Sequence, residues 1–403
     1  MSTITSSNSQ DTDDDVVPSL TVSSSSSISD AKKEDTSPTQ DKKKQDKRAA
    51  DEVAEKLGVV PTATLEKPNQ RKRASFWFRQ WLTLSQILDP IRIPNSHVNY
   101  QCVWWKAISG NDANSPVRDG GLAYDMLPPL TRWAVASPLA SKYPRFHHAN
   151  VELRTKYLDN AMDQIIQKVR SAEEQKKCIR IVLMGGGYDL RLIRVAEHYE
   201  SLLKEENDHG DNEQQQQQQQ QNQFDLVELD LPRVIAAKSE LLEKRFLRRR
   251  PELTDLVNRI RMIGVDLNKI TQVETVVRAM LEGKDLDMEG NEIVPVADGV
   301  NAGDKANPMT TGSSECFTIF IFEAVLIYLD DQVPSRLLSI LSQALKSRGE
   351  SGAICFADTL LNVDCNRQDA AKLELEEHGW ELQDWLPKPG RTRHMGWASL
   401  ASG

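Results

Sequence analysis

The chain has 403 residues, 27% of them charged, and a formal net charge of -9 at pH 7. This balance does not favour the phosphates of nucleic acid, and the basic cluster Arg248–Arg250 is expected to be a solvated face, so no nucleic-acid partner is predicted. No apolar run approaches the length of a membrane helix, and no secretory or transit signal is recognisable, which predicts a cytoplasmic protein without a membrane partner. Five cysteines without C-x-x-C spacing agree with reduced thiols in such a compartment.

Two regions of different composition follow one another. Residues 1–74 are rich in Ser, Asp, Lys, Gln and Thr, and they cannot bury enough apolar surface to offset the entropy of ordering, so we predict a disordered tail. Residues 75–403 are predicted to form one domain. Two polar insertions interrupt it, a glutamine tract near 205–223 and a Gly-rich stretch near 283–315, and both are expected to be solvated loops.

Within this domain, residues 75–175 look helical and residues 176–403 alternate between strand-like and helix-like segments. Such alternation predicts a mostly parallel sheet. The candidate strands are Ile179–Met184, Phe224–Leu229, Ile260–Val265, Phe317–Phe322 and Gly352–Ala357. The candidate helices are Tyr100–Ile108, Leu153–Val169, Leu190–Tyr199, Arg233–Arg248, Lys269–Leu281, Gln332–Lys346 and Asn366–His378. The last two segments, Trp380–Asp384 and Arg393–Leu400, are predicted to pair antiparallel at one sheet edge.

The most informative motif is the turn Gly185-Gly-Gly-Tyr-Asp189, which joins the first strand to a helix. A strand, glycine turn and helix in this order bring backbone N–H groups close to a nucleotide-like ligand, although a purely structural tight turn is an alternative. The third glycine of G-x-G-x-x-G is missing, because position 190 is Leu. Asp189 also places a negative charge where the pyrophosphate of NAD would lie. The loop therefore favours S-adenosylmethionine (SAM), which carries an ammonium and a sulfonium, over NAD.

Acidic residues follow each of the next three strands: Asp230, Asp266 and Glu323. Because ligands of parallel sheets bind at the carboxyl ends of the strands, these carboxylates are expected to line one site. The first could accept from both ribose hydroxyls, the second from an adenine amino group, and the third could lie beside the ammonium. Each acid alone could instead cap the helix that follows it. Glu228 is expected to point to the face opposite Asp230.

In their order and spacing these elements resemble the leucine carboxyl methyltransferase family of SAM-dependent enzymes, from about Trp104 to the C-terminus. The matching pieces are Arg154-Thr155 with Asp159, Met184–Arg191, Glu228–Pro232, Asp266-Leu267 and Glu323–Leu329. The resemblance implies an α/β fold of the class I methyltransferase type, a Rossmann-like, mostly parallel seven-stranded sheet flanked by helices, with an N-terminal helical cap. It also implies SAM as the cofactor.

The same resemblance assigns roles to individual residues. It implies that Arg154 pairs with the cofactor carboxylate, that Gly185 and Gly187 line the methionine end, and that Glu323 binds the amino-acid end. The remaining implied contacts are Asp230 with the ribose, and Asp266 and Leu267 with the adenine. Asp189, by its charge, is added to this cofactor set.

The sequence departs from the family at Gly186, where Ala is usual, and at Leu190, where Thr is common. The segment 142–150 lacks the Asn-Arg-Gly-Tyr-type sequence of the enzymes that act on the tail of the type 2A phosphatase. Both a small-molecule acid and a protein C-terminal leucine therefore remain possible acceptors. The Arg393–Gly396 segment favours the small molecule.

Methyl transfer to a carboxylate needs no base, because an α-carboxyl with a pKa of about 3.5 is already ionised. The sequence accordingly predicts no acid–base catalyst and no metal site. A hydroxyl acceptor would need a base, for which His147, His148 and His394 are candidates, and Tyr328 is a further candidate for substrate contact. An NAD(P)-dependent oxidoreductase and a non-catalytic adaptor with the same fold are the alternatives from other classes. The oligomeric state is open.

Overall fold

A computed structural model of the chain describes residues 80, 84, 97–110, 120–138, 140, 145–171, 178–207, 224–292, 316–358, 368–386 and 394–402. The predicted tail, 1–74, lies outside the described residues, as do 208–223 and 293–315 of the two insertions. Residues 283–292 of the second insertion are described. They turn back on themselves through a bridge between Leu286 and Glu292, and the carbonyl of Met288 accepts the N–H of Gly264 at 2.8 Å. This part of the insertion therefore packs against the sheet.

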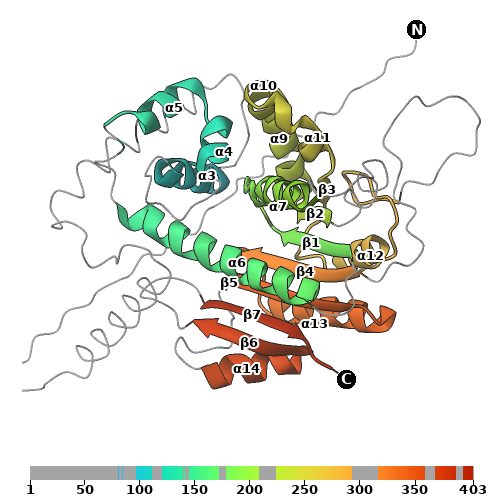
Figure 1. Cartoon of the computed structure of the whole chain (residues 1–403). Coiled ribbons are helices and arrows are strands. Elements are labelled where there is room, and N and C mark those ends of the chain that lie inside the picture. The colour runs from blue at the N-terminus through green and yellow to red at the C-terminus, as the bar shows by residue number, and fades with distance from the viewer. Residues whose placement is uncertain are drawn as a thin grey trace, which may run out of the picture. The chain divides into compact units, whose positions relative to one another are not determined.

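The described strands form one seven-stranded sheet in the order β3-β2-β1-β4-β5-β7-β6 (Figure 1). β1 to β5 pair parallel, while β7 runs antiparallel between β5 and β6. The predicted strands and the antiparallel edge pair are confirmed. The strands are β1 Cys178–Met184, β2 Phe224–Asp230, β3 Arg261–Gly264, β4 Cys316–Glu323, β5 Ser351–Asp358, β6 Trp380–Leu386 and β7 His394–Leu400.

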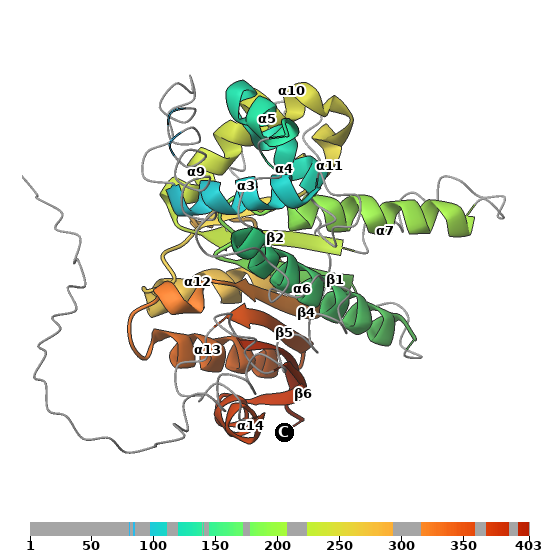
Figure 2. The ribbon, with the colours of Figure 1, turned by 90° about the vertical axis from the view of Figure 1, so that its left-hand side faces the viewer.

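Helices cover both faces of this sheet, which is why the central strands are apolar at consecutive positions and not at alternate ones. In β1, Ile181 and Leu183 pack into one core layer, whereas Val182 and Met184 pack into the other. The first layer holds α3 His97–Gly110, α6 Arg145–Ser171, α7 Arg191–Asn207 and α9 Pro232–Leu241. The second layer holds α12 Ile270–Leu281, α13 Val333–Arg348 and α14 Gln368–Glu377. The long helix α6 contacts β4, β5 and β7 as it crosses the sheet (Figure 2).

A group of helices forms the predicted cap on the first layer. It comprises α3, α4 Gly120–Met126 and α5 Pro129–Ala136, and it contacts a π-helical turn, Leu242–Phe246, between α9 and α10 Leu247–Arg249. A 3₁₀ turn, Pro251–Leu253, and α11 Thr254–Asn258 then lead to β3. None of the described helices is both long and apolar enough to cross a membrane.

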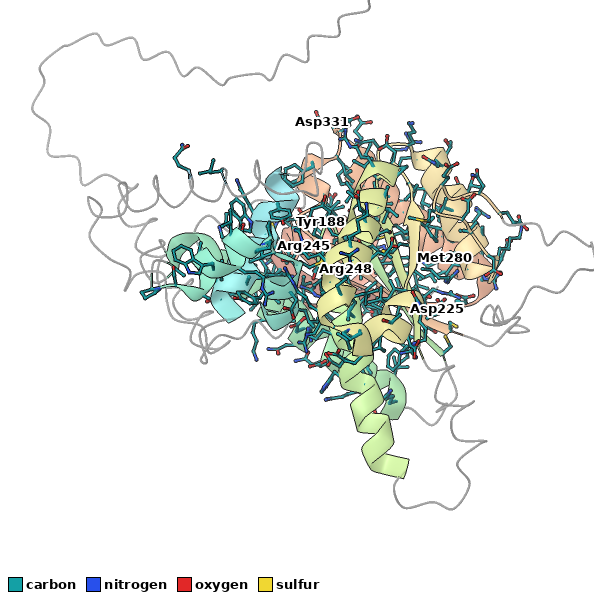
Figure 3. The ribbon with its side chains drawn as sticks, turned by 90° about the horizontal axis from the view of Figure 1, so that it is seen from above. Tyr188, Asp225, Arg245, Arg248, Met280 and Asp331 are labelled. Carbon is teal, nitrogen blue, oxygen red and sulfur yellow. The ribbon has the colours of Figure 1, made fainter. Side chains whose placement is uncertain are left out.

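Arginines after α9 hold this cap in place. Arg245, labelled in Figure 3, donates to the hydroxyl of Tyr100 at 2.8 Å and to the carbonyl of Met126 at 3.0 Å. Tyr100 in turn packs edge-on against Tyr188 of the glycine loop, with 6.2 Å between the ring centroids. Arg249 donates to the carbonyl of Leu127 at 2.9 Å. Cations are favoured at the C-terminus of a helix, where carbonyls lack partners, and α4 ends here. The interpretation of Arg248–Arg250 as a solvated face is therefore wrong for Arg249.

Candidate functional site

The candidate site lies at the carboxyl ends of β1 and β4. β1 is flanked by β2 on one side and β4 on the other, so the order of the strands reverses between them. Open α/β sheets bind their ligands outside the strand ends at such a switch point. The glycine loop follows β1, and Glu323 is the last residue of β4.

The glycine loop adopts a conformation that side chains disfavour. Gly185 and Gly187 have φ angles of 61° and 55°. The N–H of Gly185 donates to the carbonyl of Leu229 at 2.7 Å, which ties the loop to β2. A Cβ atom on Gly185 would lie 2.2 Å from Cγ2 of Val325 in the loop after β4. Backbone conformation and close packing thus both require glycine at position 185.

Replacing Gly185 by Ala is expected to destabilise the protein more than replacing Gly349, which has a similar φ of 67° but no atom near its Cβ position. Gly349→Ala should cost about 1–2 kcal/mol through left-handed strain alone. Gly185→Ala should add about 1–3 kcal/mol, because Val325 must move. Urea unfolding of both variants measures the difference. Equal losses would show that the packing against Val325 is unimportant.

Asp230 holds the glycine loop from the end of β2. Its Oδ2 accepts the N–H of Gly187 at 2.7 Å, and its Oδ1 accepts the N–H of Leu231 at 2.7 Å. Burial raises the pKa of Asp230, and these two backbone donors offset part of that effect. Each carboxylate oxygen has a second lone pair, which leaves room for a ribose hydroxyl.

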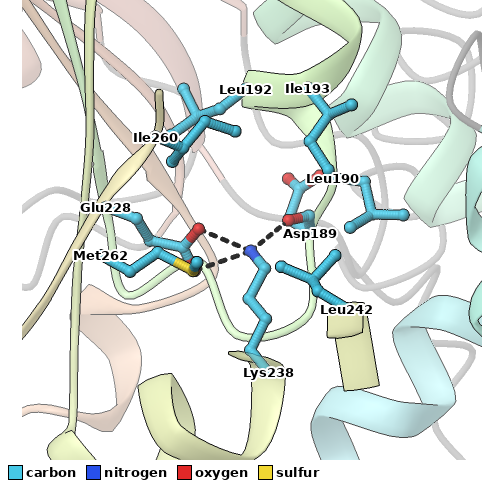
Figure 4. Close-up of a pocket in the computed structure, with 9 residues that line it drawn as sticks. All are labelled: Asp189, Leu190, Leu192, Ile193, Glu228, Lys238, Leu242, Ile260 and Met262. Atoms are coloured by element: carbon cyan, nitrogen blue, oxygen red, sulfur yellow. Dashed lines mark hydrogen bonds and ion pairs between the residues drawn. The ribbon is translucent and has the colours of Figure 1, made fainter. Parts of the chain in front are cut away.

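A buried ion pair supports the same loop from behind. Nζ of Lys238 lies 2.8 and 2.5 Å from the two carboxylate oxygens of Glu228, and it also donates to the backbone carbonyl of Asp189 at 2.5 Å (Figure 4). Burial raises the pKa of Glu228 to about 7, although Lys238 opposes the shift. The prediction that Glu228 faces away from Asp230 is wrong. Residues two apart in a strand share a face, and Glu228 approaches the glycine loop just as Asp230 does.

Buried charges gather in front of the glycine loop, on the side of the cap and of α6. Arg191, the first residue of α7, is fully buried, and its Nη2 lies 2.5 Å from Oε2 of Glu323 and 3.6 Å from Oδ2 of Asp189. Its Nε lies 3.5 Å from Oδ1 of Asp159. The outer ion pairs are Lys106–Asp189 at 2.9 Å, Arg194–Asp159 at 2.5 Å and Arg154–Glu323 at 3.5 Å.

Among the described residues, this charge cluster (Lys106, Arg154, Asp159, Asp189, Arg191, Arg194 and Glu323) joins four cations to three carboxylates. Burial acts to raise the pKa of Glu323, but Lys106, Arg191 and Arg154 outweigh it, and the pKa is lowered. The pKa of Asp189 is likewise lowered, because Lys106 and Arg191 overcome its burial. Both carboxylates are therefore ionised at neutral pH.

Arg154 is the least engaged cation of the charge cluster. Its Nε is buried and has no hydrogen-bond partner among the described residues, and its contact with Glu323 is a long 3.5 Å. A buried guanidinium is stabilised by two parallel hydrogen bonds to a carboxylate. The geometry therefore suits an additional carboxylate brought by a ligand.

The predicted adenine residues lie in the turn after β3. Asp266 accepts the N–H of Asn268 at 3.1 Å through Oδ1, and its side chain is 30% exposed. This bond lies in the turn before α12, whose N-cap residue is Lys269 and which has no side-chain cap, and Oδ2 of Asp266 lies 3.9 Å from Nζ of Lys269. The adenine contact of Asp266 stays a prediction. Leu267 is buried in the core layer of α12 and α13. Its side chain supports the turn from inside.

The four candidate substrate residues are placed differently from one another. Tyr328 lies in a 3₁₀ turn, Leu326–Tyr328, shortly after β4 and is 63% exposed. His147 and His148 lie in the first turns of α6, and their side chains are outside the described residues. His394 begins β7 at the carboxyl edge of the sheet, but it is buried and packs on Trp385 with 5.0 Å between ring centroids. The role of His394 as a base stays a prediction.

Sequence reasoning missed Lys106 and Lys238. The available signal for Lys106 was its place as a single lysine within the aromatic helix Tyr100–Ile108. Lysine is almost never fully buried without a partner, so a lysine in a buried helix indicates an ion pair. Lys238 had no comparable signal, because its partner Glu228 was predicted to lie on the other face of the sheet.

The strand order, with the antiparallel β7 inserted between β5 and β6, defines a class I methyltransferase-like fold, as predicted. No protein-family model and no curated protein sequence matches the chain.

Similar solved structures include LepI in complex with SAM (11% identity, 80% of this chain and 69% of that chain, TM-score 0.33). A pericyclic reaction enzyme is also similar (11% identity, 91% and 90%, TM-score 0.32). A third is magnesium protoporphyrin IX methyltransferase from Synechocystis PCC 6803 with bound S-adenosylhomocysteine (SAH) (9% identity, 64% and 88%, TM-score 0.32). These TM-scores are low, so the fold assignment rests on the strand order and not on the likenesses.

Proposed function

We propose that this protein is a SAM-dependent O-methyltransferase that esterifies a carboxyl group, and that it is related to the leucine carboxyl methyltransferases. The observation that carries the proposal is the buried charge cluster at the switch point, with the lightly engaged Arg154. A ligand that presents a carboxylate to Arg154 and an ammonium to Glu323 or Asp189 is complementary to this cluster. An α-amino acid end has both groups.

The other parts of the site fit the rest of SAM. The left-handed glycines allow a ligand to approach the backbone closely, and Asp230 retains acceptor capacity for a ribose. Position 190 is Leu where a dinucleotide-binding loop has its third glycine, which supports SAM over NAD(P). When bound, SAM supplies an electrophilic methyl group and a neutral leaving thioether.

Methyl transfer to a carboxylate acceptor needs no acid–base catalyst, because the acceptor is already ionised. Lys106 of the cap pairs with Asp189 of the glycine loop at 2.9 Å, and alignment and desolvation of the acceptor are the main tasks that this proposal leaves to the protein. Whether the acid is a small molecule or a protein C-terminal leucine is decided by an acceptor test. A peptide ending in a free leucine carboxylate, its amidated form and small organic acids are each incubated with radiolabelled SAM. Alkali-labile label in the free peptide or in an acid supports carboxyl methylation, and alkali-stable label in all of them contradicts it.

Arg154→Ala is expected to weaken SAH binding by about 10-fold or more, because it removes a charged partner of the ligand carboxylate. Isothermal titration calorimetry measures the affinity, with Arg278→Ala as the control, since Arg278 forms only an exposed pair with Glu274 at 2.9 Å. Equal affinity of the two variants would remove Arg154 from the site.

In the wild-type protein, SAH should raise the melting temperature and NADH should not. Stabilisation by NADH alone would favour the oxidoreductase, and stabilisation by neither would favour the adaptor.

A further inference from the structure

We propose that Asp358 is a positioning residue of this site, which holds the loop after β4 so that Glu323 and Val325 stay against the glycine loop. The inference rests on the proposed function, because it concerns the same cofactor site. Asp358 is the last residue of β5 and is fully buried, and no sequence motif pointed to it.

The carboxylate of Asp358 gathers three consecutive backbone donors. Its Oδ2 accepts the N–H groups of Val325 at 2.5 Å and Leu326 at 2.7 Å, and its Oδ1 accepts that of Ile327 at 3.3 Å. Successive N–H groups that converge in this way form an anion-binding concavity, which here is filled by a side chain of the protein itself. Buried charge-assisted bonds of this kind are among the stronger hydrogen bonds in proteins.

The loop that Asp358 holds contains backbone strain. Ala324, between Glu323 and Val325, has a φ of 59°, a left-handed conformation that is costly for a residue with a Cβ. Its N–H donates to the carbonyl of Ala357 at 3.2 Å, directly before Asp358. The end of β5 thus restrains a conformation that Ala324 would not adopt by itself.

This restraint reaches the candidate site through two neighbours of Ala324. Val325 occupies the space beside Gly185 where a Cβ would otherwise lie, and Glu323 pairs with Arg191 and Arg154. If the loop relaxes, both contacts shift together. Because the carboxylate of Asp358 binds backbone amides of this loop, the role proposed for it is to position Glu323 and Val325 and not to catalyse.

The test compares SAH affinity in Asp358→Asn with that in Trp380→Phe. Asparagine keeps one acceptor oxygen but loses the charge and places an NH₂ group against a backbone donor. Trp380→Phe deletes a buried hydrogen bond of 2.9 Å to the carbonyl of Leu338 at the opposite edge of the sheet, so it controls for a general loss of stability. Asp358→Asn should weaken SAH binding by about 10-fold or more, while Trp380→Phe should leave it unchanged.

A second substitution gives a readout that a merely structural role would not move. Ala324→Gly removes the left-handed strain, so in the Asp358→Asn background it should restore part of the lost SAH affinity.

Should Asp358→Asn fail to fold, hydrogen exchange of the wild-type protein replaces the variants. The amides of Val325 and Leu326 should exchange as slowly as strand amides, and fast exchange overturns the proposal.

The outcomes separate the two levels of inference. If wild-type protein binds SAH and Asp358→Asn binds it equally well, the positioning role is wrong and the proposed function stands. If wild-type protein does not bind SAH, the proposed function fails and the positioning role falls with it.

Discussion

Replacing Arg191 by Met should lower the free energy of unfolding by about 3–5 kcal/mol and abolish SAH binding. Arg191 is fully buried and lies within 3.6 Å of carboxylate oxygens of Asp159, Asp189 and Glu323. Methionine fills a similar volume but leaves these carboxylates with only the outer cations of the charge cluster. Removing one partner of a buried ion pair is costly, because the remaining charge stays desolvated.

The loss should depend on pH in a defined direction. The pKa values of Asp189 and Glu323 lie below their ordinary values of 3.8 and 4.5, so their contribution to stability is present above those values and is lost as the pH falls through the folded-state pKa. Without Arg191 both pKa values rise. The difference in stability between wild type and Arg191→Met should therefore be largest near neutral pH and should shrink at acidic pH.

Urea unfolding at several pH values measures this effect, with two controls. Arg278→Met removes an exposed ion pair and should change stability by less than about 0.5 kcal/mol. Adding Glu323→Gln to Arg191→Met removes the stranded charge, so the double variant should lose less than the sum of the single losses. A purely additive result, or a loss no larger than that of Arg278→Met, would contradict the central place of Arg191.

Replacing Lys238 by Met should also cost about 3–5 kcal/mol at pH 8. The side chains of Lys238 and Glu228 are only 3% and 2% exposed, so the substitution leaves a carboxylate buried beside the glycine loop. It also deletes the bond to the carbonyl of Asp189, which should weaken SAH binding.

The contribution of Glu228 to wild-type stability varies with pH in the opposite direction from that of Asp189 and Glu323, although the loss in the variant again grows with pH. The pKa of Glu228 is raised from 4.5 to about 7 in the folded protein, so stability is highest below the unfolded value and falls as the pH rises through the folded one. Loss of Lys238 raises this pKa further, because a favourable charge is removed. Lys238→Met should therefore be milder at pH 5 than at pH 8.

The matched variant is the double replacement Glu228→Gln with Lys238→Met, which removes both charges. It should be more stable than Lys238→Met at pH 8 and should show a weaker dependence on pH between 5 and 8. If both variants follow the same pH curve, Glu228 is not the titrating group.

Much of the architecture could be predicted because its signals are local. Each strand of the sheet is a short apolar run between turn residues, so the sequence predicts both ends of β1 to β5 to within one residue of the observed ends. The antiparallel pair at the sheet edge was also visible, as were the glycine turn and the acids after β2, β3 and β4. Backbone conformation explains the turn directly, since two of its glycines have positive φ.

The face on which a side chain lies, and the partner that it binds, were harder to predict from the sequence. The prediction for Glu228 failed although strand periodicity alone would have corrected it. Arg249 was expected in solvent, yet it holds the carbonyls at the end of α4, more than 100 residues earlier in the chain. A local pattern shows which residues are polar, but it does not show which partner groups a neighbouring helix or strand will place beside them.

The sequence by itself determined the fold class and placed the candidate site at the strand ends, because apolar periodicity, glycine and acidic residues act through neighbours in the chain. Only the tertiary structure decided that Lys106 reaches Asp189 across 83 residues, and that Arg191 joins Asp189 to Glu323. It also decided that Asp358 holds the loop after β4. The physical reason is that a buried charge is stable only beside a partner, and the partner is chosen by the packing of elements that are distant in sequence.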